Sequence, residues 1–156
     1  MIVRKLMVLL VAGCAVFAAT ACDDDDAGPG PERFSATLTG ASEVPPVTTT
    51  ATGTAVVEFT TTGLIYTVNV TGITNVTLAH IHGPAVAGVN AGIILNLNPN
   101  TTVTTGLLAS GTVTATTSAT VSMDSLKALI RNGNAYVNVH NTANPGGHIR
   151  GQLVRL

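Results

Sequence analysis

Short runs in which apolar and polar residues alternate constrain the fold of this chain most strongly. Residues 34–39 and 64–71 each place an apolar side chain at every second position. Because successive side chains of a strand point to opposite faces, this pattern predicts half-buried strands. Gly, Asn and Pro separate these runs from further β-rich segments, and many short strands joined by such turns predict an all-β sandwich or barrel. The further segments are residues 53–60, 76–82, 92–97, 106–116, 135–140 and 149–155.

One segment, residues 122–133, departs from this pattern and predicts a short helix between the late strands. Ser122 occupies a possible N-cap position, and Gly133 ends the segment. Apolar residues recur between them at helical spacing, which gives the helix one face to bury against the core. The expected buried stripe is Met123, Leu126, Leu129 and Ile130.

The first 22 residues resemble a secretory leader. Arg4 and Lys5 precede an apolar run over residues 6–18, which is too short for a membrane span. Small residues then lead directly to Cys22, as in the cleavage box of bacterial lipoproteins, where the cysteine is lipidated and becomes the new N-terminus. We therefore expect a lipoprotein signal peptide over residues 1–22 and an exported protein anchored in the membrane through Cys22.

Two alternatives to this processing stay open. Residues 11–13 before Cys14 resemble the lipoprotein box even better locally, but cleavage there would leave an apolar core of only about eight residues. In the second alternative, both cysteines are ordinary leader residues and the domain is secreted.

After Cys22 the chain contains no cysteine, so its core must be stable without a disulfide. Residues 23–32 are rich in Asp, Gly and Pro, which predicts a flexible tether. The remaining residues, 33–156, suit a single domain. Charged residues make up 10% of the chain and the net charge is −1, so a nucleic-acid partner is not expected.

The pair His80 and His82 is the first candidate site. If residues 76–82 form a strand, both imidazoles lie on one face, roughly 7 Å apart, where they can meet one metal ion. Gly83 and Pro84 follow and should end the strand, because proline has no N–H for the sheet. The alternative is that both are partly exposed polar residues at a sheet edge.

A third histidine, His140, lies on the more polar face of its expected strand, with Tyr136 and Asn138. If the strands that carry His82 and His140 are neighbours, the three rings converge. Three neutral imidazoles suit copper or zinc, and the fourth ligand would be His148, Glu43 or water. The alternative is that these histidines only form hydrogen bonds within loops.

Arg150 is a candidate for binding an anion, or a carboxylate such as Glu43 in a bidentate pair. A structural salt bridge is the other interpretation of this residue. No glycine-rich phosphate loop, Ser-His-Asp order or close carboxylate pair rises above chance in this sequence, which favours a protein that is not an enzyme.

Three stretches together resemble the CHRD domain, first recognised in chordin and present in many bacterial exported proteins. The resemblance runs from about Phe34 to Leu153, with His148 where the family most often has Glu. It implies an immunoglobulin-like β-sandwich and says little about biochemical role. The stretches are residues 40–47, 79–85 and 136–153.

A weaker likeness is to copper-zinc superoxide dismutase, a Greek-key sandwich. By motif, His80 and His82 resemble its copper-binding pair and His140 its late ligand, while Arg150 is similar to its anion-steering arginine. Residues 83–100 have no histidine that could bridge to zinc, and the disulfide cysteines and the zinc ligands are missing. A complete dismutase site is therefore not expected.

Two functional hypotheses follow. The first is a lipid-anchored, extracytoplasmic CHRD module at the cell envelope that binds an envelope protein or a metal ion. The second is a copper-binding protein that uses His80, His82 and His140 for copper storage, copper delivery or weak redox chemistry.

Overall fold

A computed structural model describes residues 30–114 and 120–156. Residues 31–156 form one compact unit. Within the described residues lie nine strands, one α-helix and one 3-10 turn. Their bounds are β1 Arg33–Thr39, η1 Gly40–Ser42, β2 Thr52–Phe59, β3 Gly63–Thr71, β4 Val76–His82, β5 Ile93–Leu97, β6 Gly106–Thr114, α1 Met123–Arg131, β7 Tyr136–Asn141, β8 Ile149–Gln152 and β9 Val154–Arg155.

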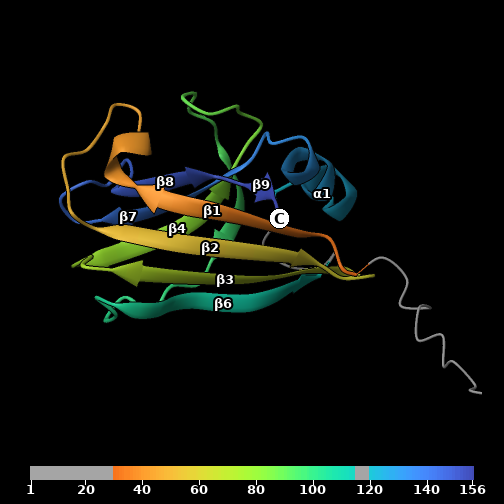
Figure 1. Cartoon of the computed structure of the whole chain (residues 1–156), viewed down its shortest axis with the longest axis horizontal. Coiled ribbons are helices and arrows are strands. Elements are labelled where there is room, and N and C mark those ends of the chain that lie inside the picture. Colours follow the sequence, from red (N-terminus) through yellow and green to blue (C-terminus); the bar gives the residue numbers. More distant parts are fainter. Residues whose placement is uncertain (1–29, 115–119) are drawn as a thin grey trace, which may run out of the picture. The chain divides into compact units, whose positions relative to one another are not determined.

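The strands form one antiparallel sheet in the order β5-β4-β7-β8-β1-β2-β3-β6, with the short β9 paired to β1. The sheet folds over, so that β4, β7 and β8 lie behind β1, β2, β3 and β6 (Figure 1). The two halves are joined where Thr39 of β1 pairs with Arg150 of β8. The predicted all-β sandwich with one short helix is confirmed, in the form of a nearly closed sheet.

The apolar positions of the alternating runs point into the space between the two halves. In β1 and β3 these side chains are buried, whereas Ile65 on the other face of β3 is 41% exposed. Every predicted strand is present, and the last one is divided into β8 and β9. Residues 115–116, the predicted end of the β6 segment, lie outside the described residues. The buried positions of β1 and β3 are Phe34, Ala36, Leu38, Leu64, Tyr66, Val68 and Val70.

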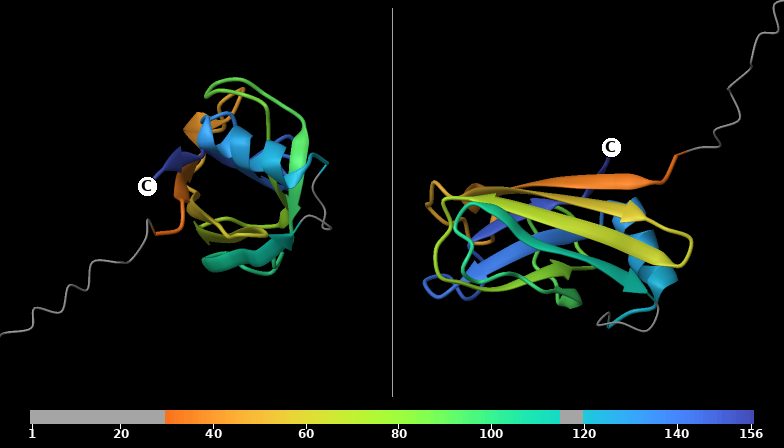
Figure 2. Two further views of the ribbon diagram at one scale, coloured as in Figure 1. Left: turned by 90° about the vertical axis from the view of Figure 1, so that its right-hand side faces the viewer. Right: turned by 90° about the horizontal axis from the view of Figure 1, so that it is seen from below.

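The predicted helix is α1, and its caps are those expected from the sequence. Ser122 accepts a hydrogen bond from the Ser125 backbone N–H, and Gly133 adopts a φ of 67° just after the helix. Leu126 and Ile130 are buried, and the other two residues of the predicted stripe pack against the same core. The helix lies across one end of the folded sheet (Figure 2), where it closes the core.

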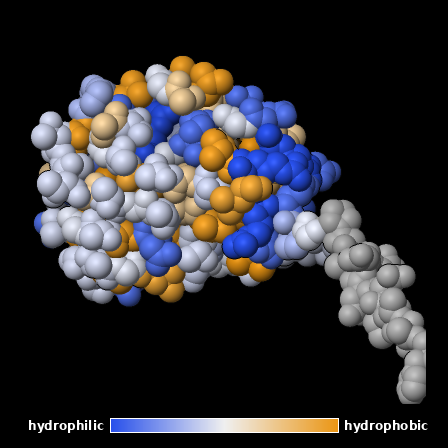
Figure 3. All heavy atoms as spheres, viewed as in Figure 1, coloured by the Kyte–Doolittle hydropathy of each residue, from blue (hydrophilic) through white to orange (hydrophobic). Residues whose placement is uncertain are grey.

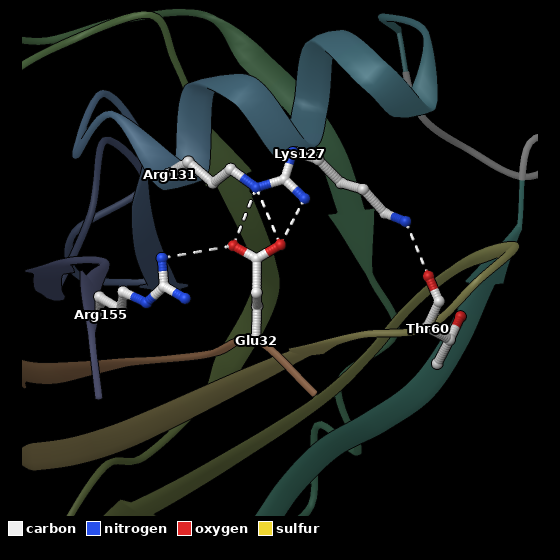
Figure 4. Close-up of polar contacts among 5 residues, drawn as sticks. All are labelled: Glu32, Thr60, Lys127, Arg131 and Arg155. Atoms are coloured by element: carbon white, nitrogen blue, oxygen red, sulfur yellow. Dashed lines mark hydrogen bonds and ion pairs between the residues drawn. The ribbon is translucent and has the colours of Figure 1, made fainter. Parts of the chain in front are cut away.

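Charged side chains gather at this end of the domain, seen as the deep blue area at the right of Figure 3. Glu32 accepts hydrogen bonds from Arg131 at 2.9 Å and 2.5 Å and lies 3.6 Å from Arg155, while Lys127 donates to the Thr60 carbonyl at 2.8 Å (Figure 4). Exposed ion pairs contribute little stability, so burial of Leu126 and its neighbours is the main force that holds α1.

The predicted leader, with Cys14 and Cys22, lies outside the described residues, as does most of the predicted tether. Glu32, at the end of that tether, is held by Arg131. In the part of the chain that the structure describes, no helix has the length and apolar character needed to cross a membrane.

Replacing Leu126 with Ala should lower the free energy of unfolding by about 2–5 kcal/mol, because it leaves a cavity where α1 closes the core. The same change at Leu107, which is 52% exposed, should cost less than about 1 kcal/mol. Urea unfolding followed by circular dichroism measures both. Equal losses in the two variants would contradict this account of how α1 is held.

Candidate metal centre

His140 of β7 comes together with His80 and His82 of β4 on the outer face of these two strands, the face turned away from the hydrophobic core. The strands pair antiparallel, with His80 opposite Asn138 and His82 opposite Tyr136. This register places His140 beside the pair. One ligand nitrogen from each ring lies within 4.8 Å of those of the other two. The rings, 4%, 8% and 6% exposed for His80, His82 and His140, form what we call the three-histidine cluster.

Two backbone carbonyls determine which nitrogens of the cluster carry protons. His82 Nδ1 lies 3.0 Å from the Ala91 carbonyl oxygen, and His140 Nδ1 lies 3.0 Å from the Pro145 carbonyl oxygen. A carbonyl only accepts hydrogen bonds, so each Nδ1 must carry the proton. In the neutral rings, both Nε2 atoms therefore present a free lone pair.

The Nε2 lone pairs of His82 and His140 have different hydrogen-bond partners. His140 Nε2 accepts a hydrogen bond from His80 Nδ1 at 3.0 Å. His82 Nε2 is buried and has no hydrogen-bond partner among the described residues. A buried acceptor without a partner is uncommon in folded proteins, and here it lies beside two further ring nitrogens. When the proton of His80 moves from Nδ1 to Nε2, the three nitrogens become an electron-pair donor set for one cation.

Burial keeps the cluster in the neutral form that binds metals. Removal from water, with smaller effects from the His140 and His82 rings, lowers the pKa of His80 from 6.5 to about 4. Burial also lowers the pKa of His82 and His140, against the effect of their carbonyl partners. At neutral pH all three rings are uncharged, so a metal ion need not compete with protons.

Arg150 and Tyr136 form a stack on the cluster. The Tyr136 ring is parallel to the His82 ring at 5.0 Å, and the Arg150 guanidinium lies 3.4 Å from the Tyr136 ring centre. The guanidinium donates to Asn90 Oδ1 at 3.0 Å and to the Val89 carbonyl at 2.7 Å. Arg150 thus holds the 83–92 segment, and among the described residues its hydrogen bonds do not include the bidentate pair with Glu43 considered above.

Neither protein residue considered as a fourth ligand belongs to the cluster. His148 has both ring nitrogens in hydrogen-bond contact, Nε2 with Thr49 Oγ1 at 3.1 Å and Nδ1 with Asn144 Nδ2 at 2.8 Å. Glu43 is 5% exposed and meets Asn138 Nδ2 at 3.5 Å. Of the three candidates for the fourth position, water is the one that the structure leaves.

Glu43 is an unusual carboxyl group. Its Oε1 is buried without a hydrogen-bond partner among the described residues. Burial raises its pKa to about 7, although the charge of Arg150 and the Asn138 hydrogen bond act in the opposite direction. Clefts of about 440 Å³ and 340 Å³ both have Glu43 in their walls, and neither is lined by a histidine of the cluster.

The groups that orient the rings were not predicted from the sequence. The carbonyls of Ala91 and Pro145 carry no side-chain signal, so no motif identifies them. The roles of Tyr136 and Asn138 were also missed, although their place on the polar face of β7 was expected. The polar alternation along β7 was the one sequence signal that pointed to these two residues.

The three stretches that resemble the CHRD domain meet at this site, with Glu43 from the first, His80 and His82 from the second, and His140 and Arg150 from the third. The model of the CHRD domain matches residues 34–153. The chain belongs to the CHRD domain family. No curated protein and no solved structure matches it. In this CHRD domain the match includes every residue of the cluster and both segments that supply the orienting carbonyls.

Acidification should destabilise the CHRD domain. Unfolded histidines take up protons below about pH 6.5, whereas folded His80 stays neutral to about pH 4, so protons favour the unfolded chain in this window. Glu43, with its raised pKa of about 7, acts oppositely between pH 4.5 and 7, but burial lowers the pKa of all four histidines. The lowered pKa values of His82, His140 and His148 add to the effect of His80, so the domain should lose stability on balance from pH 7 to 4.5.

Urea unfolding at a series of pH values measures this loss, and His80→Asn should reduce its slope. An unchanged slope in a folded His80→Asn protein would show that His80 is not buried in its neutral form.

Proposed function

We propose that this CHRD domain protein is an extracytoplasmic binding module whose ligand is a single transition-metal ion, copper or zinc, held by His80, His82 and His140. The observation that carries the proposal is the buried, unpartnered Nε2 lone pair of His82, which lies beside the two other ring nitrogens. Imidazole nitrogen is a preferred donor for both metals.

A purely structural role explains the cluster less well. A network that only formed hydrogen bonds would pair its acceptors, and an unpaired buried acceptor costs about 1–3 kcal/mol. Here the carbonyls of Ala91 and Pro145 accept hydrogen bonds from the Nδ1–H groups of His82 and His140, and the Nε2 atoms of these rings are left as acceptors. Metal-binding histidines are typically oriented in this way, through a hydrogen bond from the other ring nitrogen.

The proposal also includes export and anchoring. The leader-like residues 1–22 and the cysteine at position 22 support lipidation at the cell envelope, and residues 23–30 would then connect the anchor to the domain. The membrane is thus a partner through the lipid, and the metal ion is the proposed ligand of the domain. The proposal assigns no catalysed reaction.

The metal-free domain of residues 31–156 should bind one equivalent of copper or zinc in isothermal titration at neutral pH. His82→Ala should weaken binding at least about a hundredfold, because it removes the one donor that no other group occupies. His148→Ala is the matched control, since this ring lies outside the cluster and its loss should leave the affinity unchanged.

Absence of binding by a correctly folded domain would refute the metal site. The module would then need a protein partner.

Replacing Cys22 with Ser should abolish incorporation of labelled fatty acid into the protein expressed in a bacterial host, because lipid transfer requires this thiol. Cys14→Ser serves as the control and should leave labelling intact. Loss of the label in Cys14→Ser alone would move the processing site to Cys14, and no label in the unmodified protein would show that it is secreted without an anchor.

A further inference from the structure

We propose that the three-histidine cluster is a copper(I) site that discriminates against zinc(II) and copper(II). This inference rests on the proposed function and names the ion and its charge. Three features of the described residues carry it: the number of donors, the charge of the donors and the charge of their surroundings.

The number of donors favours copper(I). The cluster offers three nitrogens, and neither His148 nor Glu43 belongs to it. Zinc in proteins is almost always four-coordinate, and with three protein ligands it keeps a water in the fourth position. Here that fourth ligand would have to be water, because His148 and Glu43 lie outside the cluster. Copper(I) is a closed-shell ion that is stable with three ligands or two.

The charge of the donors also favours copper(I). All three ligands are neutral imidazoles, and their rings are nearly buried. The cost of moving an ion out of water rises with the square of its charge, so a divalent ion pays a far larger desolvation penalty than a monovalent one. Sites that bind divalent ions commonly offset this penalty with anionic ligands, and the cluster has none.

The surroundings are neutral or positive. Among the described residues, the buried charged side chains other than the histidines are Glu43 and Arg150. Arg150 stacks on Tyr136, which in turn stacks on His82, and its charge is one of the influences that lower the pKa of His82. Glu43 is either protonated or ionised beside Arg150. The two side chains together therefore contribute a charge of +1 or zero, and neither value compensates a divalent ion.

A displacement experiment tests the preference. The domain of residues 31–156 contains the whole described fold and no cysteine, so thiols do not compete for copper(I). It is loaded with one equivalent of zinc(II) and titrated without oxygen with copper(I) in acetonitrile, while a chromophoric indicator reports released zinc. We expect one zinc per copper(I), and a copper(I) affinity at least about a hundredfold higher than that for zinc(II).

The corresponding titration with copper(II), followed by electron paramagnetic resonance, should show binding that is weaker than that of copper(I). Zinc(II) or copper(II) that binds as tightly as copper(I) would overturn this inference and leave the proposed metal site intact. If none of the three ions binds, the proposed function fails as well.

Two variants test the origin of the preference. His148→Ala should retain the full preference for copper(I), because its ring is outside the cluster. Arg150→Gln removes the nearby positive charge and should narrow the ratio between copper(I) and zinc(II) affinities. An unchanged ratio in a folded Arg150→Gln protein would overturn the electrostatic argument, and if this variant does not fold, the displacement in the unmodified domain decides.

Discussion

The outer face of β4 and β7 is polar and yet buried, and much of the structure depends on this constraint. The inner face of the same strands carries Ala79 and Ile81, which belong to the hydrophobic core. Buried polar groups need hydrogen-bond partners, and the segments that cover the outer face supply them through the carbonyls of Ala91 and Pro145. The loops are therefore held in place by the histidines as much as the histidines are held by the loops.

Local sequence patterns predicted the elements well, because alternation and helix caps depend on near neighbours. The shared face of His80 and His82 also followed from alternation alone. That His140 would join them depended on pairing between β4 and β7, and the His80–His140 contact joins residues 60 positions apart. No local pattern specifies such a pairing. His148 illustrates the limit, because it was considered as a ligand but contacts Thr49 and Asn144 instead.

Arg150 shows how a buried cation is tolerated although residues 30–114 and 120–156 offer it no direct ion pair. Its planar guanidinium covers the face of Tyr136, whose π electrons attract the charge, and its edge donates to groups of the 83–92 segment. A lysine ammonium could not make both contacts at once, because it lacks the flat face and the fork of donors. This geometry explains why an arginine that has no direct carboxylate partner among the described residues remains compatible with a stable interior.

Because the chain has no cysteine after Cys22, the proposed metal site would also act as a structural cross-link. A metal ion shared by His80, His82 and His140 would join β4 to β7 across 60 residues of sequence, which is the kind of long-range link that disulfides provide in many secreted proteins. Unlike a disulfide, the link would depend on ion concentration, adding about 2.7 kcal/mol at a hundred times the dissociation constant. The carbonyls of Ala91 and Pro145 connect the histidines to the two loops that cover this face. Binding of the metal ion would therefore also order these loops.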